Sequence, residues 1–422
     1  MSGIGSSLEG STCFNLMQMN ESMRNSTLEA IFDPIDGIGM NLMRLTIGTS
    51  DFNPLPFYSY DDTNNNEPDN GLSSFSISAD EAFVLPAIKA SLIYTKGDNK
   101  EDGLTFFASP WSPPAWMKTS QSLQGGAFNS SYIDVYGEYL VKFVEAYHDQ
   151  GIEIEAITPQ NEPLQNEDSY PTSLMLPEQE SELIQQSLGP RLEASGLNCK
   201  IWCFDHNWAD HYYPEHILNN TAAATYVAGT AFHLYEGFPQ AMTNLHDKYP
   251  EKEVHFSEGS EFEMRGAHQL VNIFRNWAST YNAWVTLLDT TMQPNAGPFH
   301  PTSTMLELDV NSGELIKRFE YYMTGQFSKF VRKGALRVES STIGNTTLTT
   351  GSSPPPPDSL VHVAFMNADS SDIEGNNQKT IVLVVVNLSP NEQPIAIQWN
   401  ELQSSNDIIL DGESVSTFRW GY

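Results

Sequence analysis

The chain has 422 residues, of which 40% are hydrophobic and 11% aromatic, so it can bury a sizeable core and is not intrinsically disordered. It carries 53 acidic residues against 21 basic ones, a formal net charge of −32. This excess argues against nucleic acid and against an anionic membrane surface as partners, because both are bound through clustered Lys and Arg. The length predicts two or three domains, although a single α/β barrel can use about 250 residues.

No membrane-spanning or targeting segment is evident. The sequence has no run of about 18 apolar residues, so we expect no transmembrane helix and no stable membrane insertion. Met1–Gly10 lacks the basic and apolar regions of a signal peptide, which indicates a secreted or periplasmic protein only if a leader has been removed, and otherwise a cytoplasmic one. The three cysteines, Cys13, Cys199 and Cys203, are expected to be buried thiols rather than disulfides or metal ligands.

Short apolar runs alternate with longer amphipathic ones over residues 1–330. The eight runs predicted as strands are Gly3–Ser6, Met40–Ile47, Leu104–Ser109, Ile154–Thr158, Lys200–Phe204, Tyr226–His233, Glu253–Phe256 and Ala283–Leu288. The helical patterns between them include Ser78–Leu92, Ile133–Asp149, Pro177–Ser195, Pro214–Leu218 and Gly266–Thr280. This alternation favours an α/β fold, a (β/α)8 TIM barrel. A doubly wound open sheet is the alternative, but no glycine-rich phosphate loop follows the first strand.

The character of the sequence changes after about Phe330. Residues 331–422 contain no long helical pattern but five β-type runs: Ala335–Glu339, Leu360–Phe365, Thr380–Asn387, Ile395–Trp399 and Ser414–Arg419. They predict a C-terminal all-β sandwich domain. The proline-rich stretch Ser352–Pro357 is expected to be a stiff surface loop rather than a recognition motif.

In a barrel of this kind, functional residues lie at the C-terminal ends of the strands. Those ends combine carboxylates, amides and aromatic rings, which suits sugars, because aromatic faces stack on a sugar ring and polar groups bind its hydroxyls. The candidates are Asp51 after the second strand, Trp111 after the third, Asn161 and Glu162 after the fourth, Asp205 and His206 after the fifth, His233 and Tyr235 after the sixth, and Glu258 after the seventh.

Glu162 and Glu258 are the central pair. They are far apart in the sequence, but strands four and seven of an eight-stranded ring face each other across its mouth. Hydrolysis of a glycoside needs two carboxyl groups, one to protonate the departing oxygen and one to attack or to activate water. The plain alternative for any single Glu in so acidic a chain is a solvated surface charge.

Seven stretches match one known pattern, in one order along nearly the whole chain. They are Met40–Phe52, Phe57–Asp62, Phe107–Ser120, Ile157–Pro163, Ala231–Gly237, His255–Ser260 and Tyr321–Val338. Together they resemble glycoside hydrolase family 30, on the branch that includes glucosylceramidases and β-1,6-glucanases. The resemblance implies that Glu162 is the general acid/base, that Glu258 is the nucleophile, and that Asn161 binds the sugar 2-hydroxyl.

The same resemblance implies further roles around this pair. Tyr235 would hydrogen-bond the nucleophile, and Arg44 would lie beside it, although a buried ion pair is the plain alternative for Arg44. Asp51 and Trp111 would bind the outer hydroxyls, although a core aromatic is the plain alternative for Trp111. The remaining residues of this set are His233, on the same face as Tyr235, and Asp205 with His206, expected to support the acid/base side.

Two departures from the family pattern stand out. The first strand begins at about residue 3, where family members usually have a preceding segment that contributes to the sandwich, so we expect either a smaller sandwich or a truncated chain. At the end of strand eight, alignment places Leu288 where the family has a pocket tryptophan, and Asp289 is expected to bind a hydroxyl instead.

The sequence thus predicts a retaining β-glycosidase without a cofactor or metal, whose partner is a β-glucoside. A glucosylceramidase-type β-glucosidase is the main interpretation, and the alternative is a β-1,6-glucanase acting on glucan or laminarin branches. A non-catalytic carbohydrate-binding protein is the remaining alternative, and the presence of both Glu162 and Glu258 disfavours it. The oligomeric state is left open.

Overall fold

Eight parallel strands form the barrel that the sequence predicts. The computed structural model describes residues 1–94, 103–260, 262–341, 360–371, 377–399, 403–404 and 408–421. The strands pair in the order β7-β6-β5-β4-β3-β2-β1-β8. Hydrogen bonds from Ser279 N–H to Val254 O (2.8 Å) and from Phe256 N–H to the Thr280 hydroxyl (3.1 Å) join the two ends of this sheet. The strands are β1 (Gly3–Ser7), β2 (Leu42–Ile47), β3 (Thr105–Pro110), β4 (Ile154–Ile157), β5 (Lys200–Asn207), β6 (Val227–His233), β7 (Glu253–Glu258) and β8 (Thr280–Ala283).

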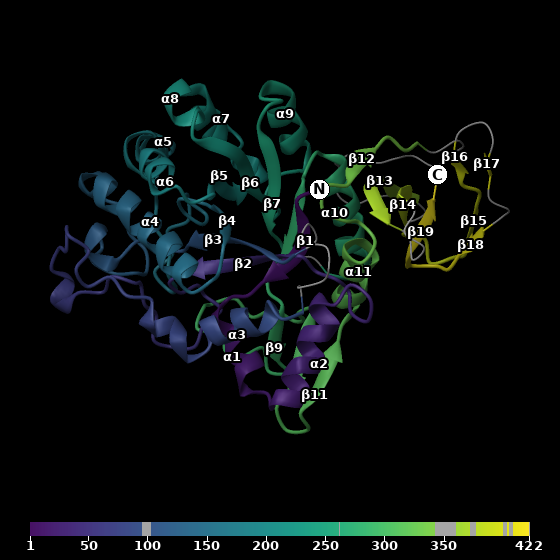
Figure 1. The fold of residues 1–422 in the computed structure, drawn as a ribbon, viewed down its shortest axis with the longest axis horizontal. Coiled ribbons are helices and arrows are strands. Elements are labelled where there is room, and N and C mark those ends of the chain that lie inside the picture. The colour runs from purple at the N-terminus through teal and green to yellow at the C-terminus, as the bar shows by residue number, and fades with distance from the viewer. Residues whose placement is uncertain are drawn as a thin grey trace.

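Helices surround these strands (Figure 1). They are α1 (Gly10–Gln18), α2 (Glu21–Phe32), α3 (Val84–Ser91), α4 (Ile133–Asp149), α5 (Pro177–Leu183), α6 (Gly189–Ser195), α7 (Tyr212–Asn219), α8 (Thr221–Ala224), α9 (Gln240–Lys248), α10 (Glu263–Arg275) and α11 (Phe319–Ser328). The helix predicted at 177–195 is interrupted by a π-helical turn, Ile184–Leu188. None of the helices in the described part of the chain is long and apolar enough to span a bilayer.

The eighth strand differs from its predicted position. We expected it at 283–288, but β8 ends at Ala283, and Leu287–Asp289 forms a separate strand, β9. Strand β9 pairs with β10 (Leu306–Asp309), which in turn pairs with β11 (Glu314–Lys317). Residues 284–288 are all buried and mostly apolar, so apolarity alone could not show where the backbone leaves the barrel.

The C-terminal part is built from antiparallel sheets beside α10 and α11 (Figure 1). One sheet has the order β12-β13-β14-β19, with β12 (Leu336–Val338), β13 (Leu360–Ser371), β14 (Asn377–Asn387) and β19 (Ser414–Gly421). The predicted fourth run, Ile395–Trp399, is divided between two short pairs, β15 (Gln393–Ile395) with β18 (Ile408–Leu410) and β16 (Gln398–Trp399) with β17 (Gln403–Ser404).

The two faces of the larger sheet pack against different partners. One face joins the main core, where the rings of Phe274 and Phe365 lie 5.5 Å apart edge to face. The other face packs on the β15–β18 pair through Val385 and Leu410. This two-layered arrangement confirms the β-sandwich next to the barrel, whereas the division at residue 330 stays a prediction. The proline-rich stretch lies outside the described residues.

Candidate active site

The two carboxylates singled out by the sequence meet at the mouth of the barrel. Glu162 follows β4 and Glu258 is the last residue of β7, so each side chain starts at the C-terminal end of a strand. Facing oxygens of the two carboxylates lie within 4.8 Å of each other. The two residues are 9% and 5% exposed, which leaves them reachable but largely shielded from water.

Arg44, on β2, carries a positive charge in the site and is fully buried. It donates to Glu258 Oε2, to Asn161 Oδ1 at 2.7 Å, to Asp205 Oδ2 at 2.8 Å and to the Ser109 hydroxyl at 3.2 Å. Burial opposes both charges of the Arg44–Asp205 pair, but their mutual attraction outweighs it. The pKa of Arg44 is therefore raised, and the pKa of Asp205 lies well below its usual range.

Three hydroxyl groups hold the Asp205 carboxylate in place. Ser109 and Thr158 each donate to Oδ2 at 2.7 Å, and Ser257 donates to Oδ1 at 2.6 Å. Hydrogen bonds to the ionised form stabilise it, so Asp205 remains a fixed negative charge. Our sequence reasoning missed these hydroxyl residues. The available signal was their place at the ends of predicted strands, next to the residues that we did select.

His233 lies between the carboxylates. Its Nδ1 is 3.2 Å from Glu162 Oε1, its Nε2 is 3.0 Å from Asp205 Oδ1, and the same Nε2 is 3.9 Å from Glu258 Oε2. Burial lowers the pKa of His233, but the three carboxylates outweigh it and raise the pKa to about 9. His233 is therefore an imidazolium that donates from both nitrogens.

The same side chains include groups that could bind a metal ion. Glu162, His233 and Glu258 form the one cluster of suitable ligand atoms found among the described residues. Imidazole binds a metal through a deprotonated nitrogen, so an ion would have to replace one of the two His233 hydrogen bonds.

The two catalytic candidates differ in their electrostatic surroundings. Burial acts to raise the pKa of Glu162, but the hydrogen bond from His233 and the positive charges around it lower the pKa. Burial raises the pKa of Glu258, and the charges of Glu162 and Asp205 add to this rise, while His233 and Arg44 oppose it. Because the two carboxylates interact directly, the protonation of one changes the pKa of the other, and the two groups titrate as a coupled pair.

Tyr235 is hydrogen-bonded to Glu258, the nucleophile candidate. Its hydroxyl donates to Glu258 Oε1 at 2.9 Å, and its backbone N–H donates to Asn207 Oδ1 at 3.1 Å. Asn207 is a further positioning residue that the sequence did not reveal. His206 lies 3.8 Å from Glu162 Oε1, on the acid/base side, and burial lowers its pKa.

Aromatic rings form one wall of the site. Trp111 and Trp284 stack with ring centroids 4.9 Å apart and planes 23° apart, and the Arg44 guanidinium lies 4.6 Å from the Trp111 ring. We expected Leu288 in place of a pocket tryptophan. The structure instead places the indole of Trp284 against Trp111, and Leu288 is fully buried in β9. Because β8 ends at residue 283, the indole enters the site from the segment that follows the strand.

The two remaining aspartates have different environments. Asp51 Oδ1 is buried without a hydrogen-bond partner, while its backbone carbonyl accepts the N–H groups of Ala296 and Gly297 at 3.0 Å. Burial and the nearby Glu258 and Glu162 raise the pKa of Asp51. Asp51 therefore has hydrogen-bonding capacity to spare, which suits a sugar hydroxyl.

Asp289 forms hydrogen bonds within its own loop. Its Oδ1 accepts the N–H and hydroxyl of Thr291, both at 2.7 Å, and the N–H of Gln293 at 2.9 Å. These contacts form a turn after β9 and do not include any residue of the carboxylate pair.

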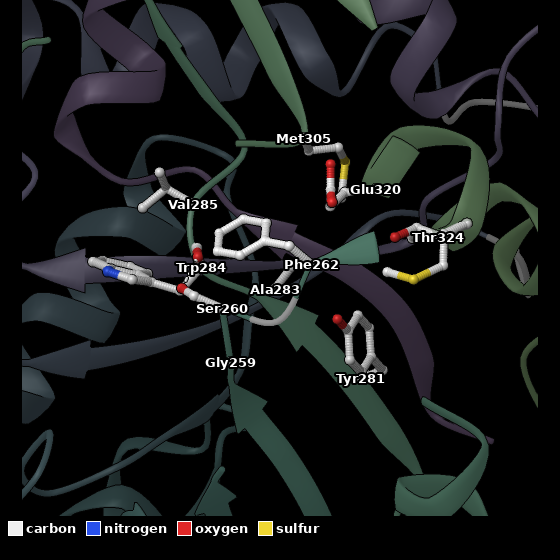
Figure 2. A pocket seen from close by; sticks show the side chains of 11 residues that line it. Gly259, Ser260, Phe262, Tyr281, Ala283, Trp284, Val285, Met305, Glu320 and Thr324 are labelled. Carbon is white, nitrogen blue, oxygen red and sulfur yellow. Dashed lines mark hydrogen bonds between the residues drawn. The ribbon is translucent and has the colours of Figure 1, made fainter. Parts of the chain in front are cut away.

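A small pocket lies behind Trp284. It is lined by Gly259, Ser260, Phe262, Tyr281, Ala283, Trp284, Val285, Met305, Glu320, Met323 and Thr324. Figure 2 shows Trp284 at one side and Tyr281 and Thr324 at the opposite side. The Ser260 hydroxyl donates to the Trp284 carbonyl, which ties the segment after β7 to the segment after β8.

Known proteins are similar to this chain in fold and in sequence. Residues 1–331 match the model of the glycosyl hydrolase family 30 TIM-barrel domain. An endo-1,6-beta-D-glucanase of Neurospora crassa is 31% identical over 96% of this chain and 84% of its own length. The lysosomal acid glucosylceramidase of Mus musculus is 27% identical over 99% of this chain and 80% of its own length. The solved endo-beta1,6-glucanase BT3312 has a TM-score of 0.86 and 29% identity, covering 100% of this chain and 91% of that one.

Proposed function

The chain belongs to glycosyl hydrolase family 30, and we propose that it is a retaining glycosidase that cleaves β-1,6-linked glucan. It is an O-glycosyl hydrolase whose substrate is a glycan or glucoside. The observation that carries the retaining mechanism is the short separation of two buried carboxylates, with facing oxygens within 4.8 Å. Retaining enzymes hold their carboxyl groups about 5–5.5 Å apart, whereas inverting enzymes leave about 6.5–9.5 Å for a water molecule.

In this proposal Glu258 is the nucleophile. Its Oε2 accepts a hydrogen bond from Arg44 and its Oε1 accepts one from Tyr235, and both contacts favour the ionised carboxylate that attack requires. Attack at the anomeric carbon forms a bond to a carboxylate oxygen and breaks the glycosidic bond. The product is a covalent glycosyl-enzyme, and water later releases the sugar with its configuration retained.

Glu162 is the general acid and then the general base. The proton that it must donate is held next to it, because His233 Nδ1 lies 3.2 Å from Glu162 Oε1. Transfer of that proton turns an ion pair into two neutral groups, which is favoured when bound sugar excludes water from the site. Glu162 then protonates the departing oxygen, and as a carboxylate it activates the water that cleaves the intermediate.

Polar and aromatic side chains that line the site are placed to bind the sugar. Asn161, held at 2.7 Å by Arg44, is set to bind the 2-hydroxyl, and the unpartnered Oδ1 of Asp51 is set to bind an outer hydroxyl. The stacked rings of Trp111 and Trp284 offer an apolar surface for a sugar ring. Asp289 Oδ1 is used within its own loop, and the expected contact of Asp289 with a sugar hydroxyl stays a prediction.

Sequence similarity favours glucan over the glucosylceramide of our main sequence-based interpretation. The Neurospora crassa endo-1,6-beta-D-glucanase has higher identity than the mouse glucosylceramidase, and the solved BT3312 glucanase covers the whole chain. Glucosylceramide remains the second candidate because the mouse enzyme aligns over 99% of the chain.

A mechanism-based label tests the chemistry. The enzyme is incubated with an activated 2-deoxy-2-fluoro-β-glucoside, or the matching β-gentiobioside, and its intact and peptide masses are measured. We expect one added sugar on the peptide that contains Glu258. A label on a different carboxylate would overturn the assignment of the nucleophile.

A substrate panel tests the linkage. Initial rates are compared on β-1,6-glucan, β-1,3-glucan with β-1,6 branches, and glucosylceramide in detergent. We expect the highest kcat/KM on β-1,6-glucan. A higher kcat/KM on glucosylceramide would make the lipid the preferred substrate and contradict the proposed specificity.

A further inference from the structure

Strand β5 is irregular next to the carboxylate pair. Phe204 and Asp205 have φ angles of 79° and 62°, and the pairing of β5 with β6 shifts its register between Phe204 and His206. Left-handed backbone is uncommon outside glycine and is unfavourable for a bulky residue such as Phe. This bulge therefore persists only if surrounding contacts hold it.

Glu180, on α5, makes such a contact. Its side chain is completely buried, and its Oε1 accepts the backbone N–H of Phe204 at 2.9 Å. Burial raises the pKa of Glu180 to about 7, and the hydrogen bond from Phe204 N–H opposes the rise. A carboxyl group is costly to bury, and the bond to Phe204 N–H offsets part of that cost while fixing the backbone of the bulge.

The bulge connects directly to the acid/base candidate. The carbonyl of Asp205 accepts the backbone N–H of Glu162 at 3.0 Å, and Glu162 is itself left-handed, with φ of 44°. The side chain of Asp205 also binds His233, which contacts the Glu162 carboxylate. Both the backbone and the side chain of Glu162 therefore depend on where the bulge places Asp205.

We propose that Glu180 is a positioning residue for Glu162: by holding Phe204 N–H it fixes the β5 bulge, and the bulge fixes Glu162 through the carbonyl of Asp205. This inference rests on the proposed function, in which Glu162 protonates the departing oxygen. A general acid acts only within hydrogen-bond reach of that oxygen, so a small displacement weakens proton transfer more than it weakens attack by Glu258.

Leaving-group dependence separates this role from a general structural one. A 2,4-dinitrophenolate departs without a proton, whereas an alkoxide departs only when protonated. Glu180→Ala and Glu180→Gln are assayed on the dinitrophenyl and methyl glycosides of one β-1,6-linked glucan oligosaccharide. We expect Glu180→Ala to lose about tenfold more kcat/KM on the methyl glycoside than on the dinitrophenyl glycoside. Glu180→Gln keeps the wild-type ratio, because its amide oxygen can still accept Phe204 N–H.

The ratio of the two rates does not depend on how much of a variant is folded, so partial misfolding does not obscure it. Glu9→Ala is the matched control, because Glu9 is also fully buried and accepts a backbone N–H, that of Thr12 at 2.9 Å. We expect Glu9→Ala to lower stability without changing the ratio. A Glu9→Ala ratio shifted as strongly as that of Glu180→Ala would overturn the inference.

Glu162→Ala serves as the reference for a missing acid. If Glu162→Ala shows no contrast between the two glycosides, the proposed function itself is wrong. If Glu162→Ala shows the contrast but Glu180→Ala loses both activities equally, Glu180 is not a positioning residue and only the present inference is wrong.

Discussion

Arg44 and Asp205 form a fully buried ion pair, with Arg44 Nη2 2.8 Å from Asp205 Oδ2. Through Arg44, the Asp205 carboxylate is connected to Glu258, and through His233 it is connected to Glu162. A single buried anion therefore positions the cation next to each of the two carboxylates at the barrel mouth.

Asp205→Asn should impair both stability and activity. The change removes the partner of a buried charge, which costs on the order of 3–5 kcal/mol of unfolding free energy. Arg44 and His233 would also lose their orientation, so we expect kcat to fall by about tenfold or more. Urea unfolding and steady-state kinetics measure the two effects.

The matched control is Asp134→Asn, which breaks the Arg191–Asp134 pair at 2.8 Å on the surface, where the Asp134 side chain is 75% exposed. Exposed pairs contribute about 0–1 kcal/mol, so little change is expected. Equal losses in the two variants would show that burial of the Arg44–Asp205 pair is not what makes it important.

The acidic limb of the pH–rate profile should report Glu258. Its pKa is raised by burial and by the neighbouring carboxylates, and the nucleophile must be ionised. Activity is therefore lost as the pH falls through a value above that of an ordinary Glu, about 4.3. Tyr235→Phe removes a hydrogen bond to the ionised form, so its kcat/KM profile should have an acidic limb at higher pH. An unchanged or lower limb would show that Tyr235 does not stabilise the Glu258 carboxylate.

Trp284→Ala should weaken substrate binding. The indole stacks on Trp111 and forms part of the aromatic wall, and loss of such a buried surface corresponds to about a ten- to hundredfold fall in kcat/KM. Trp277→Ala is the control, because Trp277 is 42% exposed and stacks on His246 and Arg337 instead. Trp277→Ala should change kcat/KM less than about twofold. A similar fall in both variants would contradict the role of Trp284.

Protonation of His362 should lower the unfolding free energy of the protein in acid. This residue, on β13, is 8% exposed, and burial together with Arg275 lowers its pKa to about 4. Because the folded pKa lies below the unfolded value of about 6.5, its contribution is complete above pH 6.5 and is lost as the pH falls from 6.5 to 4. The loss is on the order of 1–3 kcal/mol. His362→Gln should flatten the dependence of unfolding free energy on pH in that window, as followed by urea unfolding, and an unchanged slope would refute this assignment.

The barrel and the carboxylate pair could be predicted from local sequence. Alternating apolar and amphipathic segments predict parallel strands with helices between them, and the C-terminal ends of such strands share one face. Residues that follow the runs, such as Glu162, Asp205 and Tyr235, therefore had to converge once the barrel closed. Their convergence needed no knowledge of side-chain packing.

Tertiary structure alone decided the features that depend on contacts between distant segments. The apolar run at 283–288 fits a strand or a buried segment equally well, so only packing could show that the strand ends at Ala283 and that Trp284 stacks on Trp111. Nothing in the residues Phe204 and Asp205 indicates left-handed backbone, which local preference disfavours and the contact with Glu180 sustains. Sequence periodicity thus determined which residues gather at the barrel mouth, whereas long-range hydrogen bonds and stacking determined how those residues are oriented.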